Sequence, residues 1–136
     1  MDKTQLVEMA LEARKKSYSP YSKFSVGAAL LAKDGRVYTG CNIENASFSV
    51  TNCAERTAFF KAISDGNKEF EAIAIVGGEC EKTPDKICAP CGGCRQVMME
   101  FCDYDNFDII LGSTSGVIKT VKLKDILPLG FGPDSL

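Results

Sequence analysis

Apolar residues recur three or four positions apart over residues 3–17, which is the spacing of a helix with one buried face. That face comprises Leu6, Ala10, Ala13 and Ser17, with Val7 and Leu11 beside it. The turn-prone run of residues 19–22 follows, and Pro20 in that run biases the residue before it away from helix. The pattern therefore predicts a first helix over residues 3–17.

Five short apolar runs predict strands. Two of them, residues 26–31 and 36–41, flank Asp34-Gly35, a dipeptide typical of tight hairpins, so we expect antiparallel neighbours. The other three runs cover residues 72–76, 108–111 and 117–123. Further helices are predicted over residues 53–64, 90–102 and 124–127, the second of them entered through Pro90.

The order of these elements combines a hairpin with helix-connected strands. It predicts an α/β fold, a three-layer α-β-α sandwich with a mixed five-stranded sheet. We expect the helices that begin near Cys53 and Cys91 to start close together at one edge of the sheet. Backbone N–H groups and the positive ends of helices favour anions at such a place.

Composition limits the kind of protein. With 136 residues, 45% of them apolar and 25% charged, the chain is expected to form one domain over residues 1–136. The net charge is −2 and the basic residues are scattered, apart from Arg14-Lys15-Lys16 at a helix end, which argues against nucleic-acid binding. Neither a secretory leader nor an apolar run of about 18 residues is present, so we expect a cytoplasmic protein without a membrane partner.

The chain contains seven cysteines and no histidine, and this imbalance limits the chemistry of a functional site. An odd number of cysteines cannot pair completely within one chain, so reduced thiols are expected. Histidine is the usual proton carrier near neutral pH and the commonest metal ligand, and any chemistry here must proceed without it.

Cys53 and the Cys91/Cys94 pair, which begins 38 positions later, suggest three thiolate ligands. Zinc with three protein ligands keeps an open position for chemistry. Glu55 is then the candidate general acid and base for zinc-bound water. Cys53 and Glu55 are two positions apart, and within a regular helix such residues point in different directions. They can serve one site only where Cys53 begins the helix, so a helix boundary is predicted at Cys53. Arg56 is placed to hydrogen-bond thiolate sulfur and to offset its charge.

Cys53-Ala54-Glu55 followed by Pro90-Cys91-Gly92-Gly93-Cys94 is the three-cysteine form of the zinc deaminase signature. Other segments narrow the match: residues 18–24, 26–29, 40–46, 53–58 and 94–97. Over nearly its whole length the chain resembles the short bacterial-type cytidine deaminases. Phe48 departs from the tyrosine common at its position, and Gly93 from a common alanine.

The resemblance implies a nucleoside site around the zinc. The residues that match surrounding positions in the family are Phe24, Asn42, Glu44 and Ala54, with Asn42 and Glu44 on the ribose. It further implies that Glu55 shuttles protons while zinc-bound hydroxide attacks C4 of cytidine or deoxycytidine and ammonia leaves, as in pyrimidine salvage. Leu-Pro-x-x-Phe at residues 127–131 implies that Phe131 stacks on the base in a neighbouring subunit of a homotetramer.

Several alternatives stay open. Cys88-x-x-Cys91-x-x-Cys94 is compatible with three ligands of an iron–sulfur cluster, although the next cysteine, Cys102, is too distant for the bacterial ferredoxin run. A structural zinc site with Cys88 or Cys80 as fourth ligand, a binding module without catalysis, and a deaminase of another free nucleoside such as an antibiotic are the others. Cys41, Cys80, Cys88 and Cys102 receive no role, and Arg95 is either a partner of the metal ligands or an exposed helix residue.

Overall fold

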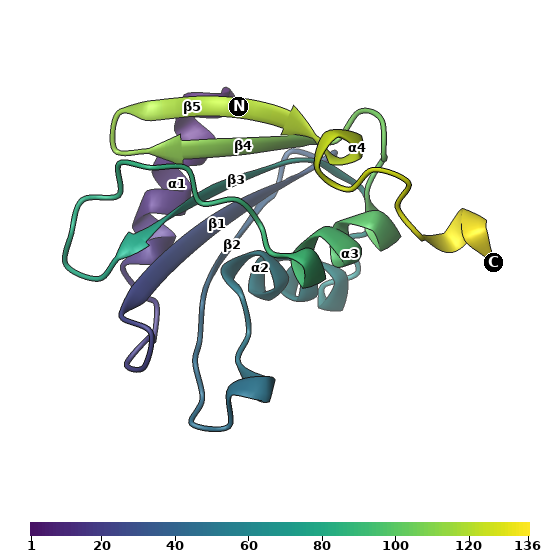
Figure 1. Ribbon diagram of the computed structural model, residues 1–136. Helices are drawn as coiled ribbons and strands as arrows, with labels where there is room; N and C mark the ends of the chain where they lie inside the picture. Colours follow the sequence, from purple (N-terminus) through teal and green to yellow (C-terminus); the bar gives the residue numbers. More distant parts are fainter.

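A mixed sheet of five strands runs through the middle of the structure, a computed structural model that describes residues 1–136 (Figure 1). Its spatial order is β2-β1-β3-β4-β5. The strands are β1 (Phe24–Ala32), β2 (Val37–Cys41), β3 (Phe70–Glu79), β4 (Asp108–Ser113) and β5 (Gly116–Lys122). The helices are α1 (Lys3–Arg14), α2 (Ala54–Ser64), α3 (Gly92–Phe101) and α4 (Leu123–Ile126), with 3-10 turns η1 (Phe48–Val50) and η2 (Pro133–Ser135).

The pairing confirms the predicted mixed sheet. β1 pairs antiparallel with β2 and with β3, β3 pairs parallel with β4, and β4 pairs antiparallel with β5. The β1–β2 hairpin turns at Gly35, whose φ of 94° lies in the left-handed region that glycine adopts without strain. The crossover from β3 to β4 contains α3, as a parallel connection requires.

The central strands β1, β3 and β4 are buried on both faces, which gives the three-layer sandwich. In β1, Ala28 and Leu30 pack under α2 and α3, whereas the intervening Ala29 packs under α1. Figure 1 shows α1 on one side of the sheet and α2 with α3 on the other. Gly27 allows the closest approach of α1, because a Cβ atom there would lie 2.0 Å from the carbonyl oxygen of Ala10.

The first helix is shorter than predicted. It begins with a capping box between Asp2 and Gln5, as expected of a helix start at Lys3, but it ends at Arg14 rather than at residue 17. Tyr18, just beyond, donates its N–H to the carbonyl of Asn42 and forms a bridge with Ile43. Because Tyr18 is held by this tertiary pairing, residues 15–17 do not continue the α-helix.

Arg14 also has a partner set that the sequence did not indicate. Its guanidinium donates to the carbonyl oxygens of Ser25, Gly78 and Glu79 at 2.9, 3.0 and 2.8 Å, where β1 begins and β3 ends. Its position at a helix end, noted from the sequence, did not indicate these contacts.

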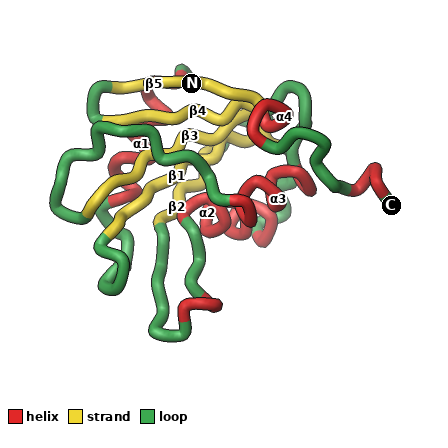
Figure 2. The backbone as a smooth tube through the Cα atoms, in the orientation of Figure 1, coloured by secondary structure: helices red, strands yellow, loops and turns green.

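Two segments extend away from the sheet. The connection between β2 and α2, which carries η1, projects as a long loop beyond the strand ends (Figure 2). The chain after α4, residues 127–136, runs out past α3 and is called the C-terminal arm below. No helix has both the length and the apolar character that a membrane crossing requires.

Candidate metal centre and active site

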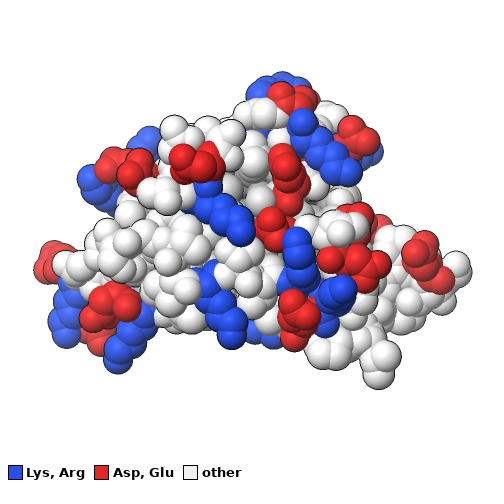
Figure 3. All heavy atoms as spheres, turned by 90° about the horizontal axis from the view of Figure 1, so that it is seen from above, with Lys and Arg blue, Asp and Glu red and all other residues white.

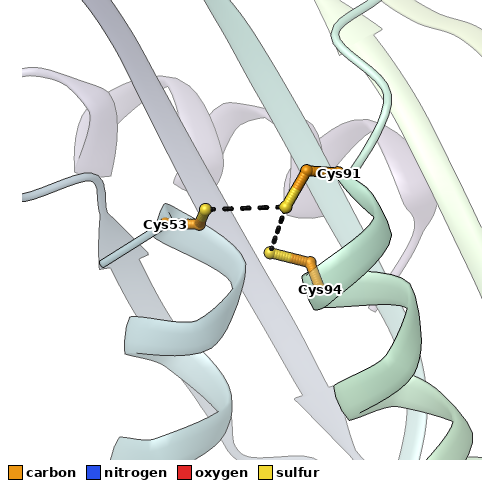
Figure 4. A group of neighbouring side chains, drawn as sticks. All are labelled: Cys53, Cys91 and Cys94. Atoms are coloured by element: carbon orange, nitrogen blue, oxygen red, sulfur yellow. Dashed lines mark hydrogen bonds between the residues drawn. The ribbon is translucent and has the colours of Figure 1, made fainter. Parts of the chain in front are cut away.

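Three cysteine side chains converge where α2 and α3 begin. Cys53 is the residue that caps α2, Cys91 caps α3, and Cys94 lies in the first turn of α3. The Sγ atoms of Cys53 and Cys91 are 3.8 Å apart and those of Cys91 and Cys94 are 3.5 Å apart (Figure 4). All three sulfur atoms lie within 4.8 Å of one another, so one ion can contact them all. The predicted helix boundary at Cys53 is confirmed.

The ionisation of this group shows why it suits a cation. The neighbouring Cys94 thiol, helped by Arg56, lowers the pKa of Cys53 to about 5, although burial opposes the shift. The closeness of Cys53 and burial raise the pKa of Cys94. Cys53 therefore becomes a thiolate more readily than Cys94. A divalent metal ion is what would allow both to bind as thiolates, as zinc does with cysteine.

Arg56 supplies positive charge beside these sulfurs. Its Nη2 atom donates to Sγ of Cys53 at 3.1 Å, as the helical spacing predicted. The thiolate in turn raises the pKa of Arg56, so the guanidinium stays charged. Its Nε–H is buried without an acceptor, which is unusual in a folded protein. An orphaned cationic donor beside a sulfur cluster fits a centre that carries more negative charge than three neutral thiols.

Glu55 follows Cys53 directly and lies in the first turn of α2. The residue is only 5% exposed. Burial raises the pKa of its carboxyl group to about 7, with a smaller contribution from the charge of Cys53. A carboxyl group with a pKa near the working pH can both accept and release a proton, which is what a general acid and base needs.

Asn42 and Glu44 lie in the loop that leaves β2. Both polar atoms of the Asn42 side-chain amide bond the backbone at the start of β1. The oxygen accepts from the N–H of Val26 at 2.9 Å, and the nitrogen donates to the carbonyl of Phe24 at 2.8 Å. It therefore fixes the start of β1, a contact that the sequence did not predict.

Glu44 is 5% exposed, and its Oε1 atom accepts from the N–H groups of Tyr21 and Ser22 at 3.0 and 3.1 Å. The Ser22 hydroxyl and these backbone groups hold the pKa of Glu44 below its ordinary value. The carboxylate is thus charged at neutral pH, with Oε2 outside both hydrogen bonds.

The remaining candidate substrate contacts differ in exposure. Phe24 opens β1, is 38% exposed and follows Lys23, whose φ is 58°. Ala54, the first residue of α2, is fully buried in the core, so no atom of it faces solvent in the single chain. Phe131 is 59% exposed on the C-terminal arm, whose backbone is held at this residue by Gln96, with Nε2 donating to the Phe131 carbonyl at 2.7 Å.

No fourth sulfur atom joins the group of three. The side chain of Cys88 packs against Gly77, where a Cβ atom would lie 2.6 Å from the sulfur. Cys80 instead contacts the hydroxyl groups of Ser19 and Ser25 at 3.2 and 2.8 Å. This arrangement does not favour the iron–sulfur cluster or the four-cysteine structural zinc site considered from the sequence.

Arg95 is not an exposed helix residue, and it contacts none of the three sulfur atoms directly. It donates to the backbone carbonyls of Pro90 and Ile126, at 2.8 and 2.6 Å, rather than to a sulfur or to solvent alone. Because Ile126 lies 31 positions away, no local pattern could have indicated this contact.

Comparison with known proteins gives the site a context. Residues 1–107 match the sequence model of a family described as the cytidine and deoxycytidylate deaminase zinc-binding region. A cytidine deaminase of Sporosarcina psychrophila is 47% identical over 136 residues, which is 100% of this chain and 96% of that protein. A blasticidin-S deaminase of Bacillus cereus is 31% identical, with 93% of this chain and 90% of that protein covered.

A solved structure supports the same relationship. The 1.6 Å crystal structure of cytidine deaminase from Burkholderia pseudomallei superposes with a TM-score of 0.87 at 45% identity, covering 96% of this chain and 100% of that chain. The predicted α/β sandwich and the resemblance noted from the sequence are both confirmed.

Proposed function

The chain belongs to the family of zinc-binding cytidine and deoxycytidylate deaminases, and from that membership we propose that it hydrolyses free cytidine and deoxycytidine to uridine and deoxyuridine with release of ammonia. The observation that carries the proposal is the convergence of three cysteine sulfurs beside a buried glutamate at two helix N-termini. A panel of nucleosides followed by ultraviolet absorbance tests it. Turnover of cytidine is the expected result, and its absence with zinc-loaded protein would contradict the proposal.

Cys53, Cys91 and Cys94 are the proposed ligands of one Zn²⁺ per chain. A zinc ion with three thiolate ligands and one open position supplies a water molecule that is activated for attack near neutral pH. Three thiolates leave the centre with a formal charge of −1. Arg56 and the two helix N-termini stabilise that negative charge, and each helix end contributes about 0.3–1 kcal/mol.

Glu55 carries the protons in this proposal. Its carboxylate accepts a proton from the attacking water and donates it to N3 of the pyrimidine. It then accepts the proton of the hydroxyl group now on C4 and delivers it to the amine, which leaves as ammonia while the C4 carbonyl forms. A pKa of about 7 suits both directions of transfer. No histidine exists in the chain to share the task.

Glu44 and Asn42 are proposed to bind the ribose. The ionised carboxylate of Glu44 has Oε2 outside its two backbone hydrogen bonds, so that atom is the acceptor we assign to a ribose hydroxyl. Asn42 would reach the sugar from an amide already aligned by the backbone of β1. For Phe24 and Ala54 the support is the family resemblance, with Phe24 exposed enough to meet a ligand.

A homotetramer with shared active sites is the proposed assembly. Large apolar side chains remain exposed in the single chain: Phe24, Ile43, Phe48, Val50, Phe60, Leu129 and Phe131. Leu129 and Phe131 lie on the C-terminal arm, which projects from the sandwich and suits insertion into a neighbour (Figure 1). Light scattering after size exclusion is expected to give four chains per particle.

A free nucleoside, rather than cytosine within a nucleic acid, is the proposed substrate. On the face in Figure 3, Lys and Arg side chains are interspersed with Asp and Glu, without the continuous basic track that a strand requires. We further propose that the chain folds as a single domain, and that it acts in pyrimidine salvage in the cytoplasm. A nucleoside antibiotic is the second candidate substrate, because the blasticidin-S deaminase is also a relative, although at 31% rather than 47% identity.

A further inference from the structure

Arg95 joins two parts of the molecule that are far apart in sequence. Its side chain leaves α3 one position after Cys94 and is half-buried. Nε donates to the carbonyl of Pro90 at 2.8 Å, and Nη1 donates to the carbonyl of Ile126 at 2.6 Å. Both acceptors belong to the backbone, so Arg95 acts on the course of the chain and not directly on a sulfur atom.

The Pro90 carbonyl belongs to the peptide group that leads into Cys91. Cys91 caps α3 with φ −68° and ψ 169°, and rotation of the preceding peptide would change that φ and turn its Sγ atom. Pro90 itself is buried. Holding its carbonyl therefore fixes the direction from which one of the three sulfurs enters the cluster.

The Ile126 carbonyl ends α4 and lies directly before the C-terminal arm. Further contacts hold the arm against α3 and the turn after it. Tyr104 donates its hydroxyl to the Leu127 carbonyl at 2.7 Å, and Gln96 donates to that of Phe131 at the same distance. A Cβ atom on either Gly130 or Gly132 would lie 2.9 Å from Met99, so the arm lies close on the helix.

We propose that Arg95 is a positioning residue that couples the cysteine loop, residues 88–94, to the C-terminal arm. The guanidinium holds its N–H groups in one rigid plane, so a displacement of one carbonyl is transmitted to the other. Such coupling is reciprocal. Zinc bound at Cys91 steadies the arm that carries Phe131, and a docked arm slows the loss of zinc.

Two measurements on the zinc-loaded chain test this inference. One is the rate of zinc release to a chelator that absorbs when it binds zinc, and the other is hydrogen exchange of backbone amides in residues 127–132. Arg95→Ala is expected to release zinc about 10-fold faster or more, as loss of an outer partner of a metal ligand does, and to speed exchange in the arm.

Gln96→Ala is the matched control, since Gln96 is the next residue on the same helix and bonds the arm alone. It is expected to speed exchange in the arm but to raise zinc release less than Arg95→Ala does, because the bond from Arg95 to the Ile126 carbonyl remains. Equal zinc release from the Arg95 and Gln96 variants would overturn the proposal.

Arg95→Lys keeps the test decisive if the alanine variant does not fold. An ammonium group presents its donors from a single atom in place of a planar fork, so we expect faster zinc release than in the wild type. Wild-type behaviour in both measurements would contradict the role of the fork. The inference rests on the proposed ligand Cys91. Cytidine turnover of the unaltered chain is therefore measured in the same preparation, because its absence would count against the proposed function and not against Arg95.

Discussion

The guanidinium of Arg56 donates a hydrogen bond to the sulfur of Cys53, with 3.1 Å between Nη2 and Sγ. The two residues lie three positions apart at the start of one helix, so the helix places a permanent positive charge beside a proposed thiolate ligand. In a chain without histidine, this contact answers the difficulty of an all-thiolate zinc site, which is too negative to activate water well.

Arg56→Gln is expected to weaken zinc binding about 10- to 100-fold, because the side chain remains polar but the charge beside the sulfur is lost. Competition with a chelator of known affinity measures the change. Arg56→Lys keeps the charge without the planar donors, so its zinc affinity is expected to lie between those of the wild type and Arg56→Gln. Zinc affinity equal to the wild type in Arg56→Gln would show that the contact does not tune the metal.

Glu55→Gln preserves the shape of the side chain and removes its acid and base function. We expect a turnover rate lower by a factor of about 10² to 10⁴ or more, the scale of lost proton-transfer catalysis, with zinc content unchanged. Steady-state kinetics and metal analysis on the same sample check both parts. An active variant would refute the assignment of Glu55.

Cysteine substitutions separate the ligands from their neighbours. Cys91→Ser is expected to lose zinc and activity, since its sulfur lies 3.8 Å from that of Cys53 and 3.5 Å from that of Cys94. Cys88→Ser, three positions earlier, is expected to keep both, because that sulfur packs against Gly77 outside the cluster. Loss of zinc from Cys88→Ser would revive the structural site with four cysteines.

Alanine substitutions at two glycines, Gly93 and Gly27, are expected to change stability in opposite directions. A Cβ atom at Gly93 would meet only Sγ of Cys91, at 3.9 Å, so Gly93→Ala is expected to stabilise the protein by up to about 1 kcal/mol through helix propensity. A Cβ atom at Gly27 would lie 2.0 Å from the Ala10 carbonyl oxygen. Gly27→Ala is therefore expected to cost about 1–3 kcal/mol or more. Urea unfolding of both variants measures the difference, and equal midpoints would contradict this explanation of the packing.

The sequence predicted those parts of the fold that local chemistry determines. Short apolar runs and the Asp34-Gly35 turn predicted the strands and the hairpin, and the need for Cys53 and Glu55 to serve one site predicted the start of α2. The three-cysteine group followed from the spacing of the motif, and the structure places its sulfurs together.

The sequence could not predict contacts between distant segments. The early end of α1 depends on the pairing of Tyr18 with the loop after β2, and the bridge made by Arg95 depends on a carbonyl 31 positions away. For Asn42, the resemblance pointed to the ribose, whereas its amide also fixes the start of β1. Such partners are set by tertiary packing, which no local pattern records.

The most direct test of a zinc-dependent cytidine deaminase is metal content and cytidine turnover measured on one preparation, before and after removal of the metal. We expect about one zinc per chain, hydrolysis of cytidine to uridine, loss of activity on chelation and its return with added Zn²⁺. Full cytidine turnover by a preparation without zinc, or zinc-loaded protein that leaves cytidine unchanged, would contradict the account.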